Sequence, residues 1–441
     1  MNYFIDPFGC VKNQVDAETM MAFLNKEGWV STDAEQADVI IVNSCGFIES
    51  AKRESINAVM AWRAAYPHKK IVLAGCLSQR YATELEESLA EATVIFGDKD
   101  ISNIGGAAAA ALSGERYAHS DATGACSVDD IENALPERPL LSLPGSAYVK
   151  ISEGCDNHCA FCSIPLIRGG LRSRTITAIV GECTALLKRG VKELCLIGQD
   201  IGSFGMDRGG QELPDLLASI STLPGDFWVR LLYIHPNHFP TRILDLMQND
   251  KRFLSYFDLP FQHGAAAVLK RMNRQQNAKD YLALLDRIRA ALPDAVIRST
   301  FLLGFPGETE KDMDELFDFQ EKSSLDWLGC FTYSREENTP AYSMKNRVPK
   351  RIALARKQQV EEKQAAITKQ RMERFIGRAF DVLVEEKIQG EALYLGRLFC
   401  HAPEVDGSAV ISSDAVLEMG SFIRGKVFVR AGFDLEIAPL R

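Results

Sequence analysis

The chain has 441 residues, of which 46% are hydrophobic and 25% are charged, and its formal net charge is −9. A length of this order suggests about three domains, and the composition is that of an ordinary folded, soluble protein. The negative charge argues against nucleic acid as a direct substrate, because binding through phosphates favours a basic surface. The N-terminus shows no signal-peptide pattern and no apolar run approaches a membrane span. We therefore expect a cytoplasmic protein without membrane contact.

Short apolar runs alternate with helical patterns in the first part of the chain. The runs are rich in β-branched residues, as buried parallel strands are, and lie at residues 3–5, 39–42, 71–73 and 94–96. Helical patterns at residues 16–27 and 49–65 lie between them. Strand alternating with helix predicts a doubly wound α/β domain over residues 1–112.

A second alternating region follows a stretch without periodicity. Residues 113–145 are dominated by Gly, Ser, Asp, Pro and Arg, which predicts a linker. Further strands separated by helices are expected at residues 147–151, 193–197, 228–233, 256–259, 297–303 and 327–333. These βα units predict a partial (β/α)6 TIM-like barrel over residues 146–376, closed by a helix at 350–375. Residues 377–441 change to short alternating segments, which predict a small β-barrel.

A chain of this length can form a hydrophobic core large enough to fold without disulfide bonds, so its cysteines need another explanation. There are 11, an odd number spread through a long chain, which fits reduced thiols and metal ligands better than a disulfide framework. Cys155, Cys159 and Cys162, here called the loop triplet, are expected in the loop after the first barrel strand, at the end where such barrels keep their chemistry. Thiolate sites usually need four ligands, so one position is left for another group. A structural zinc site with His158 as fourth ligand is the alternative, although such sites generally use two paired knuckles.

Three other cysteines follow three predicted strands of the first domain. Cys10, Cys45 and Cys76, here called the sheet triplet, each lie three to five residues beyond such a strand. In an open α/β sheet these strand ends form one edge, so we expect the three thiols to converge on a second metal site. The alternative is three unrelated buried thiols, because free cysteine is among the most buried residue types. The other cysteines are assigned no chemistry: Cys183, Cys195 and Cys330 in the core, Cys126 in the linker and Cys400 in the last domain.

The loop triplet, in the pattern Cys-x3-Cys-x2-Cys with Phe161 before the last cysteine, resembles the signature of the radical S-adenosylmethionine enzymes. The resemblance implies a 4Fe-4S cluster with three thiolate ligands and an open iron for S-adenosylmethionine, whose reductive cleavage gives a 5′-deoxyadenosyl radical. The segments around the sheet triplet, such as residues 9–13, resemble the methylthiotransferase family. That family has a second 4Fe-4S cluster in its N-terminal domain, a radical domain and a C-terminal TRAM domain. The resemblance therefore covers essentially the whole chain.

Several stretches are similar to the RimO-like branch of that family, which modifies a ribosomal protein, rather than to the MiaB-like branch, which modifies a tRNA adenosine. Residues 10–16 resemble its Cys-Pro-Lys-Asn-x-Val-Asp motif, with Val11 in place of the usual proline. Residues 378–441 contain seven Lys or Arg and ten Asp or Glu, a net charge of −3. An acidic last domain would repel tRNA and attract a basic ribosomal protein, with Glu404 and Asp406 expected to face it. The alternative is that this charge only aids solubility.

Phe161, Gln199 and Asp200 are the expected contacts of S-adenosylmethionine. Gln199 and Asp200 follow the second barrel strand at its functional end, although loop capping would explain them equally well. His235 and His263 follow the next two strands. Either could face the substrate, but a hydrogen-bonded structural histidine is the simpler interpretation.

The resemblance implies an enzyme that replaces a hydrogen on the β-carbon of an aspartate with a methylthio group. Its substrate would be small-subunit ribosomal protein S-twelve, free or within the subunit. The reaction would use two 4Fe-4S clusters, S-adenosylmethionine as radical source and methyl donor, and an external electron donor. The alternatives are a tRNA adenosine methylthiotransferase with the same chemistry and, from another class, a non-enzymatic iron–sulfur carrier.

Overall fold

The computed structural model describes residues 1–119 and 135–440. The chain forms two compact units, which are described separately. Unit 1 comprises Met1–Leu141, Ser152–Ala185 and Ser334–Tyr342, and unit 2 comprises Ser142–Ile151, Leu186–Tyr333 and Ser343–Arg441. No helix in the described part of the chain is both long and apolar enough to span a membrane.

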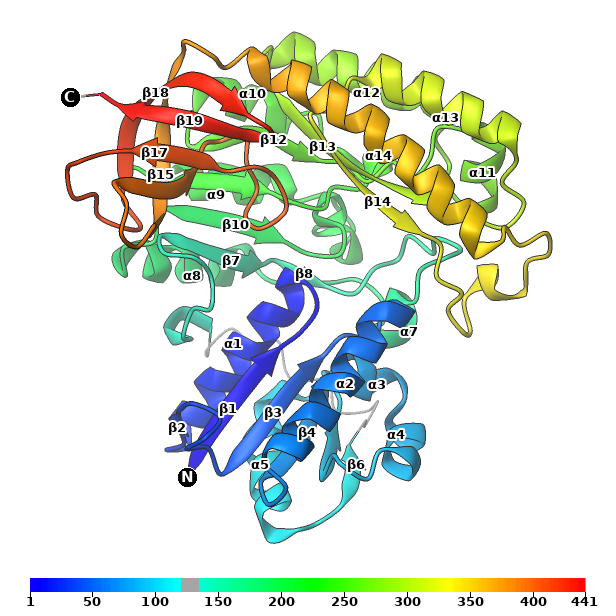
Figure 1. Ribbon diagram of the computed structural model, residues 1–441, viewed down its shortest axis with the longest axis vertical. Helices are drawn as coiled ribbons and strands as arrows, with labels where there is room; N and C mark the ends of the chain where they lie inside the picture. The colour runs from blue at the N-terminus through cyan, green and yellow to red at the C-terminus, as the bar shows by residue number, and fades with distance from the viewer. Residues whose placement is uncertain (120–134, 441) are drawn as a thin grey trace. The chain divides into compact units, whose positions relative to one another are not determined.

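Unit 1 is built on an open six-stranded sheet (Figure 1). The strand order is β2-β1-β3-β4-β5-β6, and every neighbouring pair is parallel. The bounds are β1 Asn2–Pro7, β2 Val30–Ser31, β3 Val39–Ser44, β4 Lys70–Gly75, β5 Val94–Phe96 and β6 Tyr117–His119. The order reverses between β1 and β3, and the crevice at such a switch point is where sheets of this kind bind ligands.

Helices cover both faces of this sheet. In β3, Val39 and Ile41 belong to one hydrophobic core, while Ile40 and Val42 belong to the other, as the alternation of side chains along a strand requires. The first core includes residues of α1 (Val11–Lys26) and α5 (Ile104–Ser113), and the second includes residues of α2 (Glu49–Ala65), α3 (Cys76–Arg80) and α4 (Ala82–Ser88). The predicted doubly wound α/β class is confirmed.

Part of the predicted linker, residues 113–145, has a defined structure. Tyr117–His119 form the edge strand β6, and the side chain of Arg138 is fully buried. Its guanidinium lies 2.8 Å from the carboxylate of Glu18 and 2.6 Å from that of Glu182. The sequence does not indicate either feature, because a short edge strand and the two ion pairs of one buried arginine leave no periodic pattern. The domain boundaries themselves stay a prediction.

Unit 2 contains the predicted partial barrel. Its strand order is β14-β13-β12-β11-β10-β7, every neighbouring pair is parallel, and β7 and β14 are the two open edges. The strands are β7 Ser146–Lys150, β10 Glu193–Ile197, β11 Trp228–Leu231, β12 Phe253–Asp258, β13 Val296–Leu303 and β14 Trp327–Thr332. The intervening helices are α8 Ile176–Lys188, α9 Leu213–Ser221, α10 Ile243–Asn249, α11 Ala266–Arg271, α12 Ala278–Ala291 and α13 Glu310–Ser323. Helix α14 (Lys350–Glu373) packs along β14 (Figure 1).

The last part of unit 2 is the predicted small barrel. It is closed, with the strand order β15-β16-β17-β19-β18. The bounds are β15 Ala379–Lys387, β16 Leu393–Arg397, β17 Ala409–Ser412, β18 Phe422–Ala431 and β19 Asp434–Pro439. Closure leaves no unpaired strand edge, which allows so small a sheet to fold without a covering helix.

The loop between β16 and β17 packs against the central sheet. The side chain of Asp406 in this loop is only 1% exposed. It accepts hydrogen bonds from the hydroxyl of Tyr256 at 2.5 Å and from the amide of Ala402 at 2.8 Å, and lies 3.4 Å from Nε of Arg298. The expectation that Asp406 faces a partner is therefore wrong, because partners from distant strands stabilise its burial. Glu404 in the same loop is exposed.

Candidate metal centres

The sheet triplet lies at the carboxyl edge of the unit 1 sheet. Cys10 lies three residues beyond the end of β1, Cys45 follows β3 directly, and Cys76 follows β4 directly as the first residue of α3. Because β1, β3 and β4 are parallel neighbours, their carboxyl ends lie side by side at the switch point. The structure thus brings together three residues that are far apart in the sequence.

Two glycines allow the loops of the sheet triplet to approach closely. A Cβ atom on Gly9, whose φ is +96°, would lie 2.9 Å from Cβ of Cys45. A Cβ atom on Gly46 would lie 2.7 Å from the carbonyl oxygen of Cys76. Real Cβ atoms do not reach these distances, so any other residue at either position would push two loops apart.

Asn13 ties the same three loops together. Its side chain is buried, and its Nδ2 donates hydrogen bonds to the carbonyl oxygens of Phe8 at 3.1 Å and Ser44 at 2.9 Å. Its Oδ1 accepts from Sγ of Cys76 at 3.3 Å. The backbone carbonyl of Asn13 in turn accepts from Nδ2 of Asn43 at 2.7 Å. One amide side chain therefore holds the loop after β1 against those after β3 and β4.

The three thiols of the sheet triplet differ in exposure. Cys10 is exposed, Cys45 is half-buried and Cys76 is buried. Burial raises the pKa of the Cys45 thiol, and it raises that of Cys76 well above its ordinary value even though the cation of Arg168 lies beside it. Thiolate is the form that binds metal, so the thiols of Cys45 and Cys76 stay protonated until a metal displaces the proton.

The loop triplet lies in unit 1, between two short strands that pair with each other. These are β8 (Ser152–Glu153) and β9 (Arg172–Ser173), which close the loop at its base. The amide of Cys155 donates to the carbonyl of Gly169 at 3.2 Å, and the amide of Cys162 donates to that of Cys159 at 3.0 Å. Nδ2 of Asn157 lies 3.2 Å from Sγ of Cys155. The three cysteines therefore lie in a loop that is ordered by hydrogen bonds. A loop is what the sequence predicted.

Neither triplet forms a compact single-ion site. Among the described residues, the groups of three or more His, Cys, Asp or Glu ligand atoms that lie within 4.8 Å of one another include neither set of sulfurs. A tetrahedral zinc ion with Zn–S bonds of about 2.3 Å would need its sulfurs about 3.8 Å apart. The wider spacing, which holds for His158 with the loop triplet as well, argues against the zinc alternative. A set of three soft thiol donors without a fourth cysteine suits an iron–sulfur cluster with one open position.

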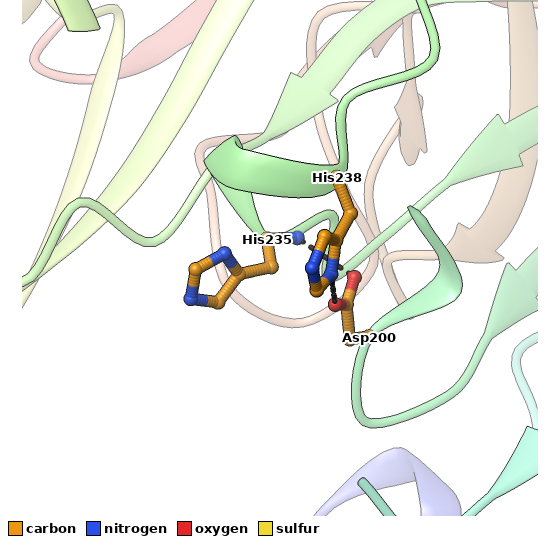
Figure 2. A group of neighbouring side chains, drawn as sticks. All are labelled: Asp200, His235 and His238. Atoms are coloured by element: carbon orange, nitrogen blue, oxygen red, sulfur yellow. Dashed lines mark hydrogen bonds and ion pairs between the residues drawn. The ribbon is translucent and has the colours of Figure 1, made fainter. Parts of the chain in front are cut away.

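One compact group of possible metal ligands lies in unit 2, at the carboxyl ends of β10 and β11. It consists of Asp200, His235 and His238 (Figure 2). Nδ1 of His238 lies 2.6 Å from Oδ2 of Asp200. The other carboxylate oxygen accepts from the amides of Gly202 and His235, each at 3.0 Å. These bonds favour the alternative in which Asp200 caps its loop over a direct contact with S-adenosylmethionine.

The ring of His235 does not offer a free lone pair to a metal. Figure 2 shows it directed away from the carboxylate of Asp200, whereas the ring of His238 faces that carboxylate. Nδ1 of His235 accepts from the amide of Asn237 at 3.2 Å, and its Nε2 contacts the guanidinium of Arg274. Burial, together with the charge of Arg274, lowers the pKa of His235 to about 3, so the ring is neutral. We assign no ion to this group and interpret His235 as a structural histidine.

His263 is also held by hydrogen bonds inside unit 2. Its Nδ1 accepts from the amide of Ala265 at 2.9 Å, and its Nε2 lies 3.5 Å from the carboxylate of Glu308. The carboxylate of Glu308 accepts from the amide of Gly304 and pairs with Arg356 at 2.8 Å. This buried network fixes the turn after β13, which supports the structural interpretation of His263.

The remaining predicted site residues lie in different units. Phe161 is half-buried within the loop of unit 1, and Gln199 is half-buried at the carboxyl end of β10 in unit 2. Their contact with S-adenosylmethionine stays a prediction. Of the cysteines that are assigned no chemistry, Cys183, Cys195 and Cys330 are buried as expected. Cys400 in the last domain is buried as well, and Cys126 lies outside the described residues.

Two functional candidates were not found from the sequence. They are Asn13, which lies within the motif of residues 10–16, and Arg168. Asn13 carried a weak signal, because it lies three residues after a cysteine at the start of a helix. Arg168 carried none, since its partners come from separate segments of the chain.

Three family models match the chain in the order expected. They are the uncharacterized protein family UPF0004 over residues 2–97, the radical SAM superfamily over residues 149–319 and the TRAM domain over residues 376–438. The solved structure of the radical S-adenosylmethionine methyltransferase TsrM from Kitasatospora setae shares the fold, with a TM-score of 0.55 and 13% identity. That match covers 77% of this chain and 74% of the other. Fold and cysteine pattern thus define the class, a radical S-adenosylmethionine protein with a TRAM domain.

Relatives with higher sequence identity to this chain indicate one family within this class. The ribosomal protein uS12 methylthiotransferase RimO of Treponema denticola is 44% identical and aligns over 98% of this chain and 99% of its own. The proteins of the same name from Syntrophomonas wolfei and Acetivibrio thermocellus are 40% and 38% identical. Those alignments cover 96% of both chains in the first case, and 97% of this chain and 96% of the relative in the second. The chain belongs to the RimO family of methylthiotransferases.

Proposed function

We propose that the chain methylthiolates an aspartate of ribosomal protein uS12, replacing a hydrogen on its β-carbon with a methylthio group. The observation that carries this proposal is the full-length similarity, at 38–44% identity, to proteins named ribosomal protein uS12 methylthiotransferase RimO. Similarity over almost the whole of both chains includes the last domain, where substrate preference is expected to be encoded. An external electron donor and a cytoplasmic location belong to the same proposal.

The proposal assigns one 4Fe-4S cluster to the loop triplet and another to the sheet triplet. When bound, the first would supply the electron that cleaves S-adenosylmethionine, and the second would hold the sulfur that is transferred. The chain contributes three soft thiol ligands at each site. It also supplies polar neighbours for the sulfurs, such as Asn157 beside Cys155 and Asn13 beside Cys76. With three cysteines at each site, one position remains for a group that is not a cysteine.

Phe161 and Gln199 are proposed to contact S-adenosylmethionine. Asp200 is proposed to act indirectly, by holding the loop that carries Gln199. Support for this division comes from the hydrogen bonds of Asp200, which connect its carboxylate to Gly202, His235 and His238.

The charge of the last domain supports a protein substrate over tRNA. Acidic side chains outnumber basic ones in residues 378–441 by ten to seven. Several of them are exposed, namely Glu386, Glu391, Glu404, Asp414 and Glu418. Such a surface attracts a basic ribosomal protein and repels the phosphates of tRNA. Asp406 does not contribute to this attraction, because its carboxylate is buried and pairs with Tyr256 and Arg298.

Mass spectrometry of ribosomal proteins from a strain that lacks the chain tests the proposal. We expect uS12 without the methylthio group, and we expect the group to return when purified, reconstituted chain is added with S-adenosylmethionine and a reductant. Unmodified uS12 in the wild-type strain, together with methylthioadenosine loss from tRNA in the deletion strain, would favour the tRNA alternative. Absence of deoxyadenosine release from the reconstituted chain would favour the carrier alternative.

A further inference from the structure

Arg168 is a buried cation placed between the two cysteine triplets of unit 1. It directly follows the short helix α7 (Ile164–Ile167), six residues after Cys162, and its side chain is only 4% exposed. Burying a guanidinium is costly unless its donors are paired, so the position of Arg168 has to be explained by its partners.

The side chain of Arg168 contacts residues next to the sheet triplet and residues next to the loop triplet. Nη2 donates to Sγ of Cys76 at 2.9 Å, to Oδ1 of Asn13 at 2.9 Å and to Oδ2 of Asp16 at 2.7 Å. These three residues belong to the loops and helices of the sheet triplet. Through one group, the chain segment of the loop triplet therefore contacts a sulfur of the sheet triplet.

The remaining donors of Arg168 pair with two more carboxylates. Nε lies 3.0 Å from Oδ2 of Asp98, and Nη1 lies 3.3 Å from Oε1 of Glu153. Glu153 belongs to β8, at the base of the loop triplet, and Asp98 follows β5. Acidic groups on three sides fix the plane of the guanidinium, so the N–H group that faces Cys76 has little freedom to turn away.

We propose that Arg168 is a positioning residue that raises the reduction potential of the cluster on Cys10, Cys45 and Cys76. The inference rests on the proposed function, which supplies a cluster at that triplet. It adds a role for a residue that is not a ligand. The same side chain keeps the loop triplet's segment fixed against the sheet triplet.

The physical basis is the change in charge on reduction. One electron enters the cluster from the external donor, the cluster becomes more negative by one charge, and no bond to Arg168 forms or breaks. The guanidinium stays protonated throughout. An N–H group and a positive charge next to a cysteine sulfur stabilise the more negative, reduced form more than the oxidised form, which raises the potential.

The test is a redox titration of the reconstituted full-length protein, followed by electron paramagnetic resonance. The signal that changes on addition of S-adenosylmethionine reports the loop cluster, and the other signal reports the sheet cluster. In Arg168→Lys, the shorter side chain cannot keep the bond to Cys76 together with the three carboxylates. We expect its sheet cluster to become harder to reduce, with at least a tenfold change in the reduction equilibrium constant, which is 59 mV for one electron. The loop cluster should keep its potential.

Arg80→Lys is the matched control. Arg80 is also a buried arginine of unit 1, 5% exposed, and it pairs with Glu336 at 2.7 Å. It donates to the carbonyl of Gly46, next to Cys45, rather than to a sulfur. We expect no change in either potential. An equal shift in both variants would mean that any disturbance of the buried ion pairs alters the cluster, and would overturn the specific role of Arg168.

A second measurement needs no variant and covers the case in which Arg168→Lys does not fold. In protein labelled with 15N-arginine, the reduced sheet cluster should show a hyperfine coupling to a labelled nitrogen. Absence of that coupling, or an unchanged potential in a folded Arg168→Lys variant, would overturn the inference while leaving both clusters in place. A wild-type protein with only one paramagnetic cluster would instead contradict the proposed function itself.

Discussion

Unit 1 carries both cysteine triplets in loops or, for Cys76, at the start of a helix, whereas Cys195, Cys330 and Cys400 of unit 2 are buried in its core. Unit 2 contains a different kind of polar centre. There the carboxylate of Glu193 pairs with Arg230 at 2.7 Å and with Arg397, and all three side chains are almost fully buried. Asp406 pairs in a similar way with Tyr256 and Arg298.

The thiols of unit 1 are suited to bind metal, whereas the buried ion pairs of unit 2 are suited to stabilise the fold. Thiols in loops can exchange a proton for a metal, because part of the triplet reaches solvent and no packed core has to open. Paired charges inside unit 2 have all their partners within the protein, so they connect the last barrel to the central sheet. Changes in the triplets should therefore remove activity with little loss of stability, and changes in the charged pairs should do the reverse.

The largest effect is expected from the loop triplet. Changing Cys155, Cys159 and Cys162 together to Ala should reduce deoxyadenosine release to background, because no ligands remain for the cluster that cleaves S-adenosylmethionine. Chromatography of the products measures this. Cys330→Ala, at a buried cysteine of unit 2, is the control and should retain release. Release from the triple variant above the metal-free background would break the assignment.

Changing the sheet triplet should remove methylthiolation but not the release of deoxyadenosine. With Cys10, Cys45 and Cys76 changed to Ala, deoxyadenosine release should stay measurable while methylthiolated uS12 disappears. The reason is that the ligands proposed to hold the transferred sulfur are gone and the loop triplet is intact. Mass spectrometry of uS12 and product chromatography on one sample give both values. A parallel decrease of the two products would mean that the triplets serve a single centre.

In unit 2 the expected effect is on stability. Asp406→Ala leaves the buried hydroxyl of Tyr256 without its acceptor and removes one of the two carboxylates beside the half-buried Arg298, the other being Asp258. The loss should destabilise the fold by about 1–3 kcal/mol. Glu404→Ala, two residues away and exposed, should change stability by no more than about 0.5 kcal/mol. Urea denaturation followed by circular dichroism measures both. Equal stabilities for the two variants would contradict the burial of Asp406.

The smallest effect is a dependence of stability on pH. Burial alone would raise the pKa of Glu193, but the charges of Arg397 and Arg230 outweigh it and lower the pKa to about 2. A carboxyl with a lowered pKa stabilises the fold above its unfolded value of about 4.3, and this contribution is lost as the pH falls toward 2. By about pH 3.5 the loss should reach about 1 kcal/mol. The stability difference between wild type and Glu193→Gln should therefore shrink between pH 7 and pH 3.5, and a constant difference would be inconsistent with a lowered pKa.

Much of the fold could be predicted because the signals were local. Helix α2 has the expected bounds, and each strand predicted in the first two regions lies within or beside an observed one. The start of α1 at Val11 was missed, because its first turn is polar and carries no apolar pattern.

The parts that could not be predicted depend on distant partners. Asp406 looked like a surface charge, but it is buried by a tyrosine 150 positions away. Arg168 contacts residues up to 155 positions away, and nothing in its neighbours along the chain indicates burial. The sheet triplet could be predicted only because each of its cysteines follows a recognisable strand. Three local strand patterns were therefore enough to predict that three distant cysteines lie close together.

The iron content of anaerobically reconstituted protein tests most directly whether the two triplets hold two separate clusters. We expect about eight irons per wild-type chain and about four in either triple variant, because each variant keeps one set of ligands. Cys330→Ala should keep about eight irons, as two intact four-iron clusters require. About four irons in the wild-type chain, or the loss of all iron from one triple variant, would contradict the two-cluster account.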